Sequence, residues 1–147
     1  MSRAEQLRVP EDADTATLIS HAHLLVSRRV SEGVTKAGYP AKPSYGAVFA
    51  LINGDGSRLT DLARGAQMSP QAMGELVDEL EGLGYVVRTP DPRDRRAKLI
   101  MLTDEGRRVS SAGGRAIATL EQAITAALGV RGHRDLRRLL LRLLQQG

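Results

Sequence analysis

The sequence predicts one mainly α-helical domain that carries a single small β-hairpin, and three observations support this fold class. The chain has 147 residues and is 41% hydrophobic and 26% charged, which suits one globular domain. It contains only one Phe, three Tyr and no Trp, so its core must be built from aliphatic side chains, which favours packed helices. Apolar residues recur at helical spacing along most of the chain, and only the stretch around residues 85–102 changes to the period of strands.

A loose arm and then a long helix are predicted at the N-terminus. Residues 1–14 are polar and mixed in charge, and the helix after them begins at Asp14 or Thr15, either of which can cap it. We expect the helix to end near Lys36, because Gly38 and Pro40 disfavour its continuation. Its apolar side consists of Leu18, Ala22, Leu25, Val26, Val30 and Val34.

Three shorter helices are predicted next, and each has its own start signal. The first opens at Pro43-Ser44, with Ser44 as its cap, and ends at the turn formed by residues 53–56. Thr60 caps the second, which covers residues 61–65. The third begins at Ser69-Pro70, because proline at the first helical position costs no hydrogen bond, and it ends at Gly84. Its apolar face consists of Ala72, Met73, Leu76, Val77, Leu80 and Leu83.

The pattern after Gly84 predicts a hairpin followed by two more helices. Two strands cover residues 85–89 and 98–102, and residues 90–97 form a polar tip between them. A capped helix begins at residues 103–106 and runs to about Leu128, and a last helix starts near His133. This last helix carries a stripe that is too apolar for a helix lying alone on a small domain, so we expect a partner to cover it. The stripe consists of Leu136, Leu139, Leu140, Leu143 and Leu144.

The order of these elements is typical of a winged helix-turn-helix that covers residues 44–103. A short helix, a turn and a second helix precede a hairpin with a basic tip. Such a second helix can present its N-terminal side chains to base edges in the major groove, and an arginine-bearing hairpin can reach the backbone or the minor groove. The formal net charge of +4 is consistent with a polyanionic partner.

Several runs within this region match a known family. The most specific are Asp91-Pro92-Arg93-Asp94-Arg95-Arg96-Ala97-Lys98 and Leu102-Thr103-Asp104-Glu105-Gly106-Arg107. With the runs 59–63, 68–73, 76–81 and 84–88, they show that the stretch 59–107 resembles the MarR family of bacterial transcriptional regulators.

The resemblance implies a homodimer that binds a pseudo-palindromic operator in double-stranded DNA. The N-terminal and C-terminal helices, residues 14–38 and 104–147, would interleave with those of the partner within one domain of residues 1–147. The family also implies a repressor that responds to a small aromatic or phenolic effector. We therefore expect a DNA-binding regulator rather than an enzyme.

The candidate DNA contacts fall into three groups. The resemblance places DNA contacts at the tip arginines Arg93, Arg95 and Arg96, and it also pairs Asp94 with Arg96 to brace the tip. The N-terminal face of the recognition helix supplies the second group, in which Gln can bond adenine and Glu can accept from cytosine. This second group is Ser69, Pro70, Gln71 and Glu75. The third group consists of the helix caps Ser44, Thr60 and Ser69, which can offer helix N-termini to phosphates.

The charge of the recognition helix departs from the family pattern. Residues 69–83 hold four acidic residues and no basic one, whereas residues 86–98 hold five basic and two acidic residues. Because acidic groups repel phosphate, the grip on DNA must come largely from the hairpin and from helix termini. The alternative is a degenerate winged-helix module that binds proteins and has lost specific DNA binding.

The sequence also predicts an effector site and argues against a metal site, a cofactor, an enzyme active site and a membrane span. The resemblance places a ligand between the dimer base and the winged region, near His21, Arg28, Tyr39, Tyr45 and Phe49. The chain contains no Cys, and its histidines lack metal-ligand spacing, so we predict no metal and no cofactor. No nucleophile–base pair or phosphate-binding loop indicates an enzyme. No apolar run is long enough to cross a bilayer and no signal-peptide pattern is present, so we expect a cytoplasmic protein.

Overall fold

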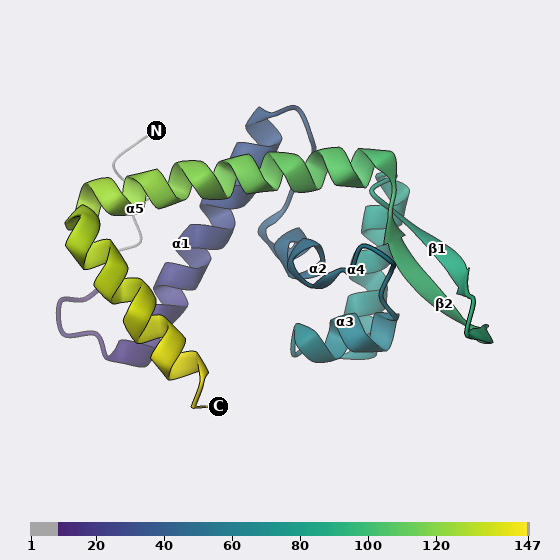
Figure 1. Cartoon of the computed structure of the whole chain (residues 1–147), viewed down its shortest axis with the longest axis horizontal. Helices are drawn as coiled ribbons and strands as arrows, with labels where there is room; N and C mark the ends of the chain where they lie inside the picture. The colour runs from purple at the N-terminus through teal and green to yellow at the C-terminus, as the bar shows by residue number, and fades with distance from the viewer. Residues whose placement is uncertain (1–8, 147) are drawn as a thin grey trace.

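The computed structural model describes residues 9–146, so the first eight residues of the predicted N-terminal arm lie outside the described residues. The predicted fold class is confirmed, because helices dominate and one antiparallel hairpin is present (Figure 1). The elements in chain order are α1 (Thr15–Lys36), the 3₁₀ turn η2 (Pro43–Tyr45), α2 (Gly46–Leu51), α3 (Leu59–Gly65), α4 (Pro70–Gly82), β1 (Val86–Asp91), β2 (Asp94–Leu102) and α5 (Asp104–Leu144).

The molecule consists of a compact lobe and an extended helical part. The short helices and the hairpin form the lobe, and α5 runs from the hairpin across the molecule and past α1 (Figure 1). The two long helices cross closely at Gly33, where a Cβ atom would lie 2.5 Å from the Cβ of Ala116. Within the described chain no helix is long and apolar enough to cross a membrane.

Two predicted helix starts, those of α1 and α4, are confirmed by their capping hydrogen bonds. Asp14 accepts a bond from the Thr17 N–H at 2.8 Å, and α1 ends at Lys36 as expected. Ser69 accepts from the Ala72 N–H at 3.1 Å at the start of α4. These side chains satisfy N–H groups that the first turn of a helix leaves free.

Two other predicted caps are wrong. Ser44 lies inside η2, because Pro43, whose φ suits a first helical position, starts that turn one residue earlier and leaves Lys42 at the cap position. Thr60 lies within the first turn of α3, whose cap position is Arg58. No described side chain caps η2, α2 or α3 by a hydrogen bond.

The hairpin is longer than the sequence pattern predicts. Its strands pair from Val86 opposite Leu102 up to Asp91 opposite Asp94, so only Pro92 and Arg93 lie between them. The predicted eight-residue tip is therefore wrong. Polar residues can continue the ladder because a two-stranded hairpin leaves most of its side chains in solvent. On its other edge β2 is bridged by Ser57, which exchanges two backbone hydrogen bonds with Ile100.

The lobe packs around apolar side chains that come from its helices and from its hairpin. Val48, Leu62, Met73, Val77 and Ile100 are each at most 1% exposed. They come from α2, α3, α4 and β2, so the helix-turn-helix and the hairpin share one core.

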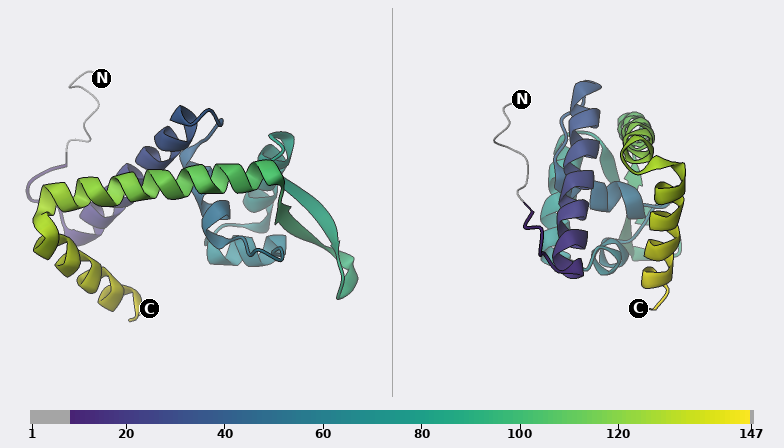
Figure 2. Two further views of the ribbon diagram at one scale, coloured as in Figure 1. Left: turned by 45° about the horizontal axis from the view of Figure 1, so that its top comes forward. Right: turned by 90° about the vertical axis from the view of Figure 1, so that its left-hand side faces the viewer.

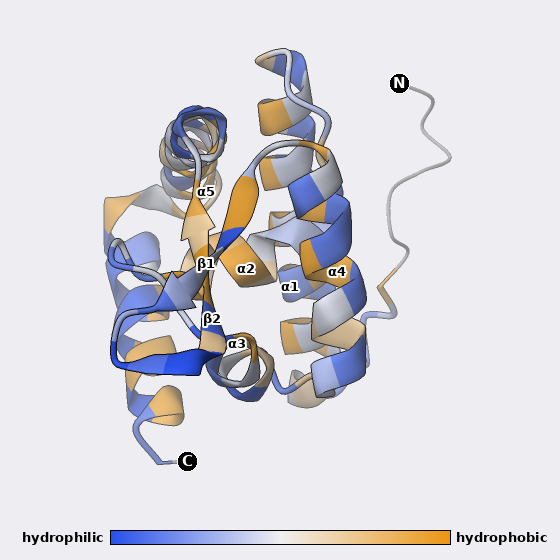
Figure 3. Ribbon diagram, turned by 90° about the vertical axis from the view of Figure 1, so that its right-hand side faces the viewer, coloured by the Kyte–Doolittle hydropathy of each residue, from blue (hydrophilic) through white to orange (hydrophobic). Residues whose placement is uncertain are grey.

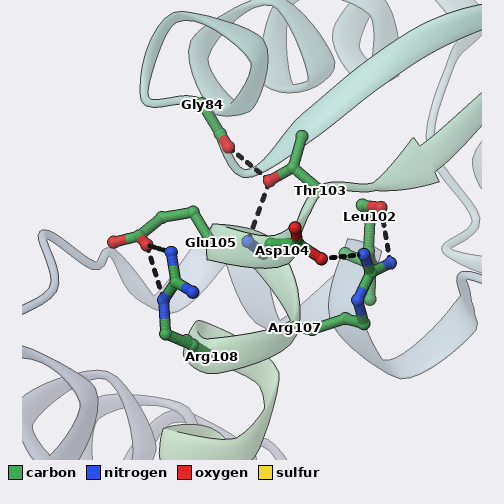
Figure 4. Close-up of polar contacts among 8 residues, drawn as sticks. Gly84, Leu102, Thr103, Asp104, Glu105, Arg107 and Arg108 are labelled. Carbon is green, nitrogen blue, oxygen red and sulfur yellow. Dashed lines mark hydrogen bonds and ion pairs between the residues drawn. The ribbon is translucent and has the colours of Figure 1, made fainter.

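The start of α5 is pressed against the backbone of the lobe (Figure 4). Thr103 donates its hydroxyl to the Gly84 carbonyl and accepts from the Gly106 N–H at 3.0 Å, which confirms it as the predicted cap. The Thr103 N–H donates to the Tyr85 carbonyl at 3.0 Å. Gly106 allows this approach, because a Cβ there would lie 1.9 Å from the same oxygen.

The last two predicted helices join at a bend. Gly129 has φ 71° and ψ 163°, a conformation that favours glycine, and the chain resumes a helix directly after it rather than near His133. The segment that follows turns away from the first part of α5 (Figure 1). His133 closes the bend, because its Nδ1 lies 2.7 Å from the Thr125 hydroxyl and its Nε2 lies 3.3 Å from Glu121.

Candidate nucleic-acid interface

The exposed face of α4 carries the residues predicted to read bases. Met73, Leu76, Val77 and Leu80 face the core, so the opposite side of the helix is open to solvent. Gln71 and Glu75 are four residues apart, so they lie one helical turn apart on that open side. Ser69, Pro70, Gln71 and Glu75 are all exposed.

The tip of the hairpin presents three arginines to solvent, and Figure 3 shows it as a strongly hydrophilic projection. Arg93 sits in the two-residue turn with its side chain 81% exposed. Arg95 and Arg96 follow on β2 and are also exposed. Because successive residues of a strand point to opposite faces, these two side chains project on different sides of the hairpin.

An ion pair that the sequence analysis missed joins the hairpin to α3. The buried carboxylate of Asp91 accepts from Arg58 at 3.0 Å (Nε) and 2.7 Å (Nη2), and from the Arg93 N–H at 2.9 Å. The Arg93 N–H and then the Arg58 guanidinium hold the pKa of Asp91 below its usual value. Arg58 thus sets where the tip lies relative to the helix-turn-helix.

The predicted brace between Asp94 and Arg96 forms differently. The Asp94 carboxylate accepts from the backbone N–H of Arg96 at 3.1 Å, and its ion pair is with Arg58 at 3.7 Å. The Arg96 guanidinium therefore has no carboxylate partner among residues 9–146 and stays free for another ligand.

The acidic side chains of α4 are largely paired with cations from neighbouring elements. Arg88 on β1 bonds Asp78 at 2.6 Å and Glu81 at 2.9 Å. Lys42, just before η2, donates to Glu79 at 2.7 Å. The fourth carboxylate, that of Glu75, has no cation within 4.0 Å in the described part of the chain.

The two mispredicted caps belong to other elements than α4. Ser44 is exposed in η2, whose Tyr45 hydroxyl donates to Glu79 at 3.1 Å, so it sits beside the C-terminal half of α4. Thr60 is exposed on the first turn of α3. The open N-terminal face of α4 itself carries Ser69, Pro70, Gln71 and Glu75, and the hairpin tip is held to the start of α3 through Arg58.

The five predicted effector contacts do not form one pocket. Tyr45 is buried and bonded to Glu79, and the Phe49 ring packs against Tyr85 at 6.3 Å, so both belong to the core of the lobe. His21 and Arg28 lie on α1, where their polar contacts are with residues of the same helix.

Of the five residues, Tyr39 lines a hollow on the surface of the described residues. This hollow, of about 370 Å³, is otherwise lined by α5 residues that the prediction missed. Two of them, Arg107 and Arg108, pair with Asp104 and Glu105 (Figure 4). The α5 lining residues are Arg107, Arg108, Ser111 and Arg115.

A second hollow of about 550 Å³ lies between α1 and α5 and shares Arg115 with the first. Its lining is largely apolar, with Leu25, Leu120 and Ile124 among its residues. Within residues 9–146 no group of three His, Asp or Glu side chains could hold a metal ion.

Comparison with known proteins places this geometry in a family. A family model described as MarR family matches residues 40–97. The transcriptional activatory protein BadR of Rhodopseudomonas palustris is 38% identical over 64 residues, which are 44% of this chain and 37% of that protein. The transcriptional regulator HosA of Escherichia coli O111:H- is 30% identical over 71 residues, or 48% of this chain and 53% of that protein. The matches thus span about a third to a half of these curated relatives.

Solved structures extend the similarity to nearly the whole chain. The transcriptional repressor CouR of Rhodococcus jostii RHA1, bound to a 23-mer DNA duplex, is 31% identical with a TM-score of 0.72, and the alignment covers 90% of this chain and 91% of CouR. MarR of E. coli in its reduced form gives a TM-score of 0.78 at 22% identity, covering 92% and 99%, a similarity that concerns the fold. The resemblance noted in the sequence is confirmed: the chain belongs to the MarR family.

Proposed function

We propose that this protein is a dimeric, sequence-specific DNA-binding regulator that acts as a repressor. The observation that carries the proposal is the joint presentation of the open face of α4 and the arginine tip on one packed lobe. The ion pair of Arg58 with Asp91 holds the tip to α3, which packs against α4. A helix of this width enters a major groove while the tip reaches the adjacent backbone or minor groove.

Base reading is assigned to Gln71 and Glu75. A glutamine can bond adenine through two hydrogen bonds, and a carboxylate can accept from the amino group of cytosine. Glu75 is suited to this role because, unlike the other carboxylates of α4, it has no cationic partner among the described residues. The two residues are separated by about 6 Å along the helix axis, a distance of roughly two base-pair steps.

Dimer formation accounts for the apolar side chains that the single chain leaves in solvent. Leu139, Leu143 and Leu144, beyond the bend of α5, are 53%, 52% and 75% exposed. On α1, Leu18 and Leu24 are 47% and 55% exposed. Both segments lie at the end of the molecule away from the hairpin (Figure 2). A two-fold partner that covers them would bring two copies of α4 to half-sites about one DNA turn apart, hence a pseudo-palindromic operator.

Effector control is assigned to the hollow beside Tyr39. Its three arginines and one aromatic ring suit a small aromatic acid or a similarly anionic aromatic compound. CouR has been solved with p-coumaroyl-CoA, a phenolic and anionic compound, at 30% identity to this chain. An effector there would contact the first part of α5, which links the lobe to the dimer end, and it would act by favouring one spacing of the two lobes.

The base-reading assignment is tested by the substitution Gln71→Ala. Binding would be measured against a set of operator duplexes in which each position is varied in turn. We expect the substitution to relax the preference at one base pair of each half-site while the remaining preferences persist. An unchanged preference at every position would exclude Gln71 as a base reader.

A protein-interaction module without specific DNA binding is the second candidate, and the acidic composition of α4 favours it. The pairing of three of the four carboxylates weakens that argument. Weak binding that is equal for all duplexes and insensitive to salt would support this candidate, because counterion release accompanies any extensive phosphate contact.

A further inference from the structure

We infer that Arg88 makes the acidic recognition helix compatible with DNA by neutralising carboxylates of α4 from outside the helix. The inference rests on the proposed DNA-binding function and names a residue that supports it without needing to touch the duplex. Arg88 lies on β1, and three hydrogen bonds join it to α4.

The contacts of Arg88 engage two carboxylates at once. Its Nη2 donates to Asp78 at 2.6 Å and its Nη1 donates to Glu81 at 2.9 Å, while its backbone N–H donates to the other oxygen of Glu81 at 3.2 Å. The Arg88 side chain is 28% exposed, whereas that of Asp78 is 69% exposed. The cation therefore lies behind the more exposed carboxylate, on the side of the protein.

The position of Asp78 explains why this neutralisation matters for DNA. Asp78 follows Gln71 by seven residues and Glu75 by three, so all three lie on one face of α4. That face is the one predicted to enter the major groove. An uncompensated carboxylate there would repel the phosphates that flank the groove.

Arg88 could act by neutralising charge or only by linking α4 mechanically to β1. These two roles predict different orders of operator affinity among three variants. Arg88→Gln removes the cation and leaves two carboxylates. The double variant Asp78→Asn/Glu81→Gln removes both carboxylates and keeps the cation. The triple variant, which carries all three substitutions, is neutral in this cluster. Each variant breaks the ion pairs, so a mechanical link that depends on them is weakened in all three, whereas the backbone N–H of residue 88 remains a donor in each.

The experiment is an anisotropy titration of the full chain and its variants with one operator duplex and one scrambled duplex at about 150 mM salt. Arg88→Gln should weaken operator binding on the order of five-fold, because two carboxylates per protomer then lose their cation and one of them, Asp78, lies on the face that would enter the groove. The triple variant should bind at least as tightly as the wild type, and the double variant more tightly still. Thermal unfolding followed by circular dichroism would confirm that each variant is folded.

The control is Arg138→Gln, which removes an arginine paired with Asp135 on the segment beyond the bend of α5. It should change operator affinity by less than about two-fold at a protein concentration where sedimentation shows both proteins to be dimers, because Arg138 and its partner lie on α5 and not on α4. A triple variant as weak as Arg88→Gln, or an Arg88→Gln variant equal to the wild type, would overturn the inference. If the wild type itself did not distinguish the two duplexes, the proposed function would fail first, and this inference with it.

Discussion

The contact between α5 and Tyr85 allows a sharp test of how the lobe is joined to the long helix. A Cβ atom at position 106 would lie 1.9 Å from the backbone carbonyl oxygen of Tyr85 and 2.9 Å from the carbon of the same carbonyl group. Cβ atoms essentially never approach other atoms within 3.0 Å, so Gly106→Ala must move α5 away from Tyr85 by about 1 Å. That movement would strain the Thr103 N–H bond to the same oxygen, which is 3.0 Å long.

The expected cost of Gly106→Ala is about 2 kcal/mol of unfolding free energy. Overpacking costs about 1–3 kcal/mol, and weakening one backbone hydrogen bond adds about 1 kcal/mol. Alanine offsets about 1 kcal/mol of this cost, because its helix propensity is higher than that of glycine. The matched control is Gly114→Ala on the same helix, where a Cβ meets nothing within 4 Å. This control should stabilise the protein by about 0.5–1 kcal/mol.

Both variants would be compared with the wild type by urea denaturation followed by circular dichroism. A single protein concentration is used throughout, because dimerisation would otherwise change the apparent stability. Opposite signs for the two alanine substitutions are predicted. If both stabilised the protein equally, α5 would not press on Tyr85 as described.

Three further predictions concern charge, pH and assembly. Arg93→Ala should reduce the slope of log affinity against log salt by about 2 per dimer, because one phosphate contact is lost from each protomer; an unchanged slope in binding titrations would place the tip off the DNA. The Lys42 ammonium, with the Tyr45 hydroxyl, holds the pKa of Glu79 below its usual value, so this contact stabilises the fold above that value and is lost as the pH falls through the lowered pKa. Glu79→Gln should accordingly lose less stability than the wild type between pH 6 and pH 3, as measured by urea midpoints. Leu140→Arg should dissociate the dimer in sedimentation experiments, whereas Val87→Arg, at a similarly exposed position on the hairpin, should not.

The features that the sequence predicted correctly depend on neighbours in the chain. Asp14, Ser69 and Thr103 each cap a helix through an N–H three residues later, so the pattern of a few residues is sufficient to identify them. A break between two helices was also predicted after about Leu128, although the structure places a bend at Gly129 and continues the helix at once.

The features that sequence reasoning missed depend on contacts between distant residues. Arg58 meets Asp91 across 33 positions, and Lys42 meets Glu79 across 37. No local pattern marks such pairs. Pairing of α4 carboxylates with cations from other elements also explains why the acidic composition of α4 overstated its negative charge. The extra length of the hairpin likewise comes from pairing between strands, because residues 94–97 are too polar to indicate a strand by themselves.

Reading of a specific DNA sequence by the lobe is the property on which the proposed function depends. The most direct test is a fluorescence-anisotropy titration of the purified chain with duplex DNA from upstream of its own gene, beside a scrambled duplex of equal length, at about 150 mM salt. Tight binding to the native duplex alone is expected, with one dimer per site. Equally weak binding to both duplexes, extended to a random duplex library without selection of any sequence, would contradict it.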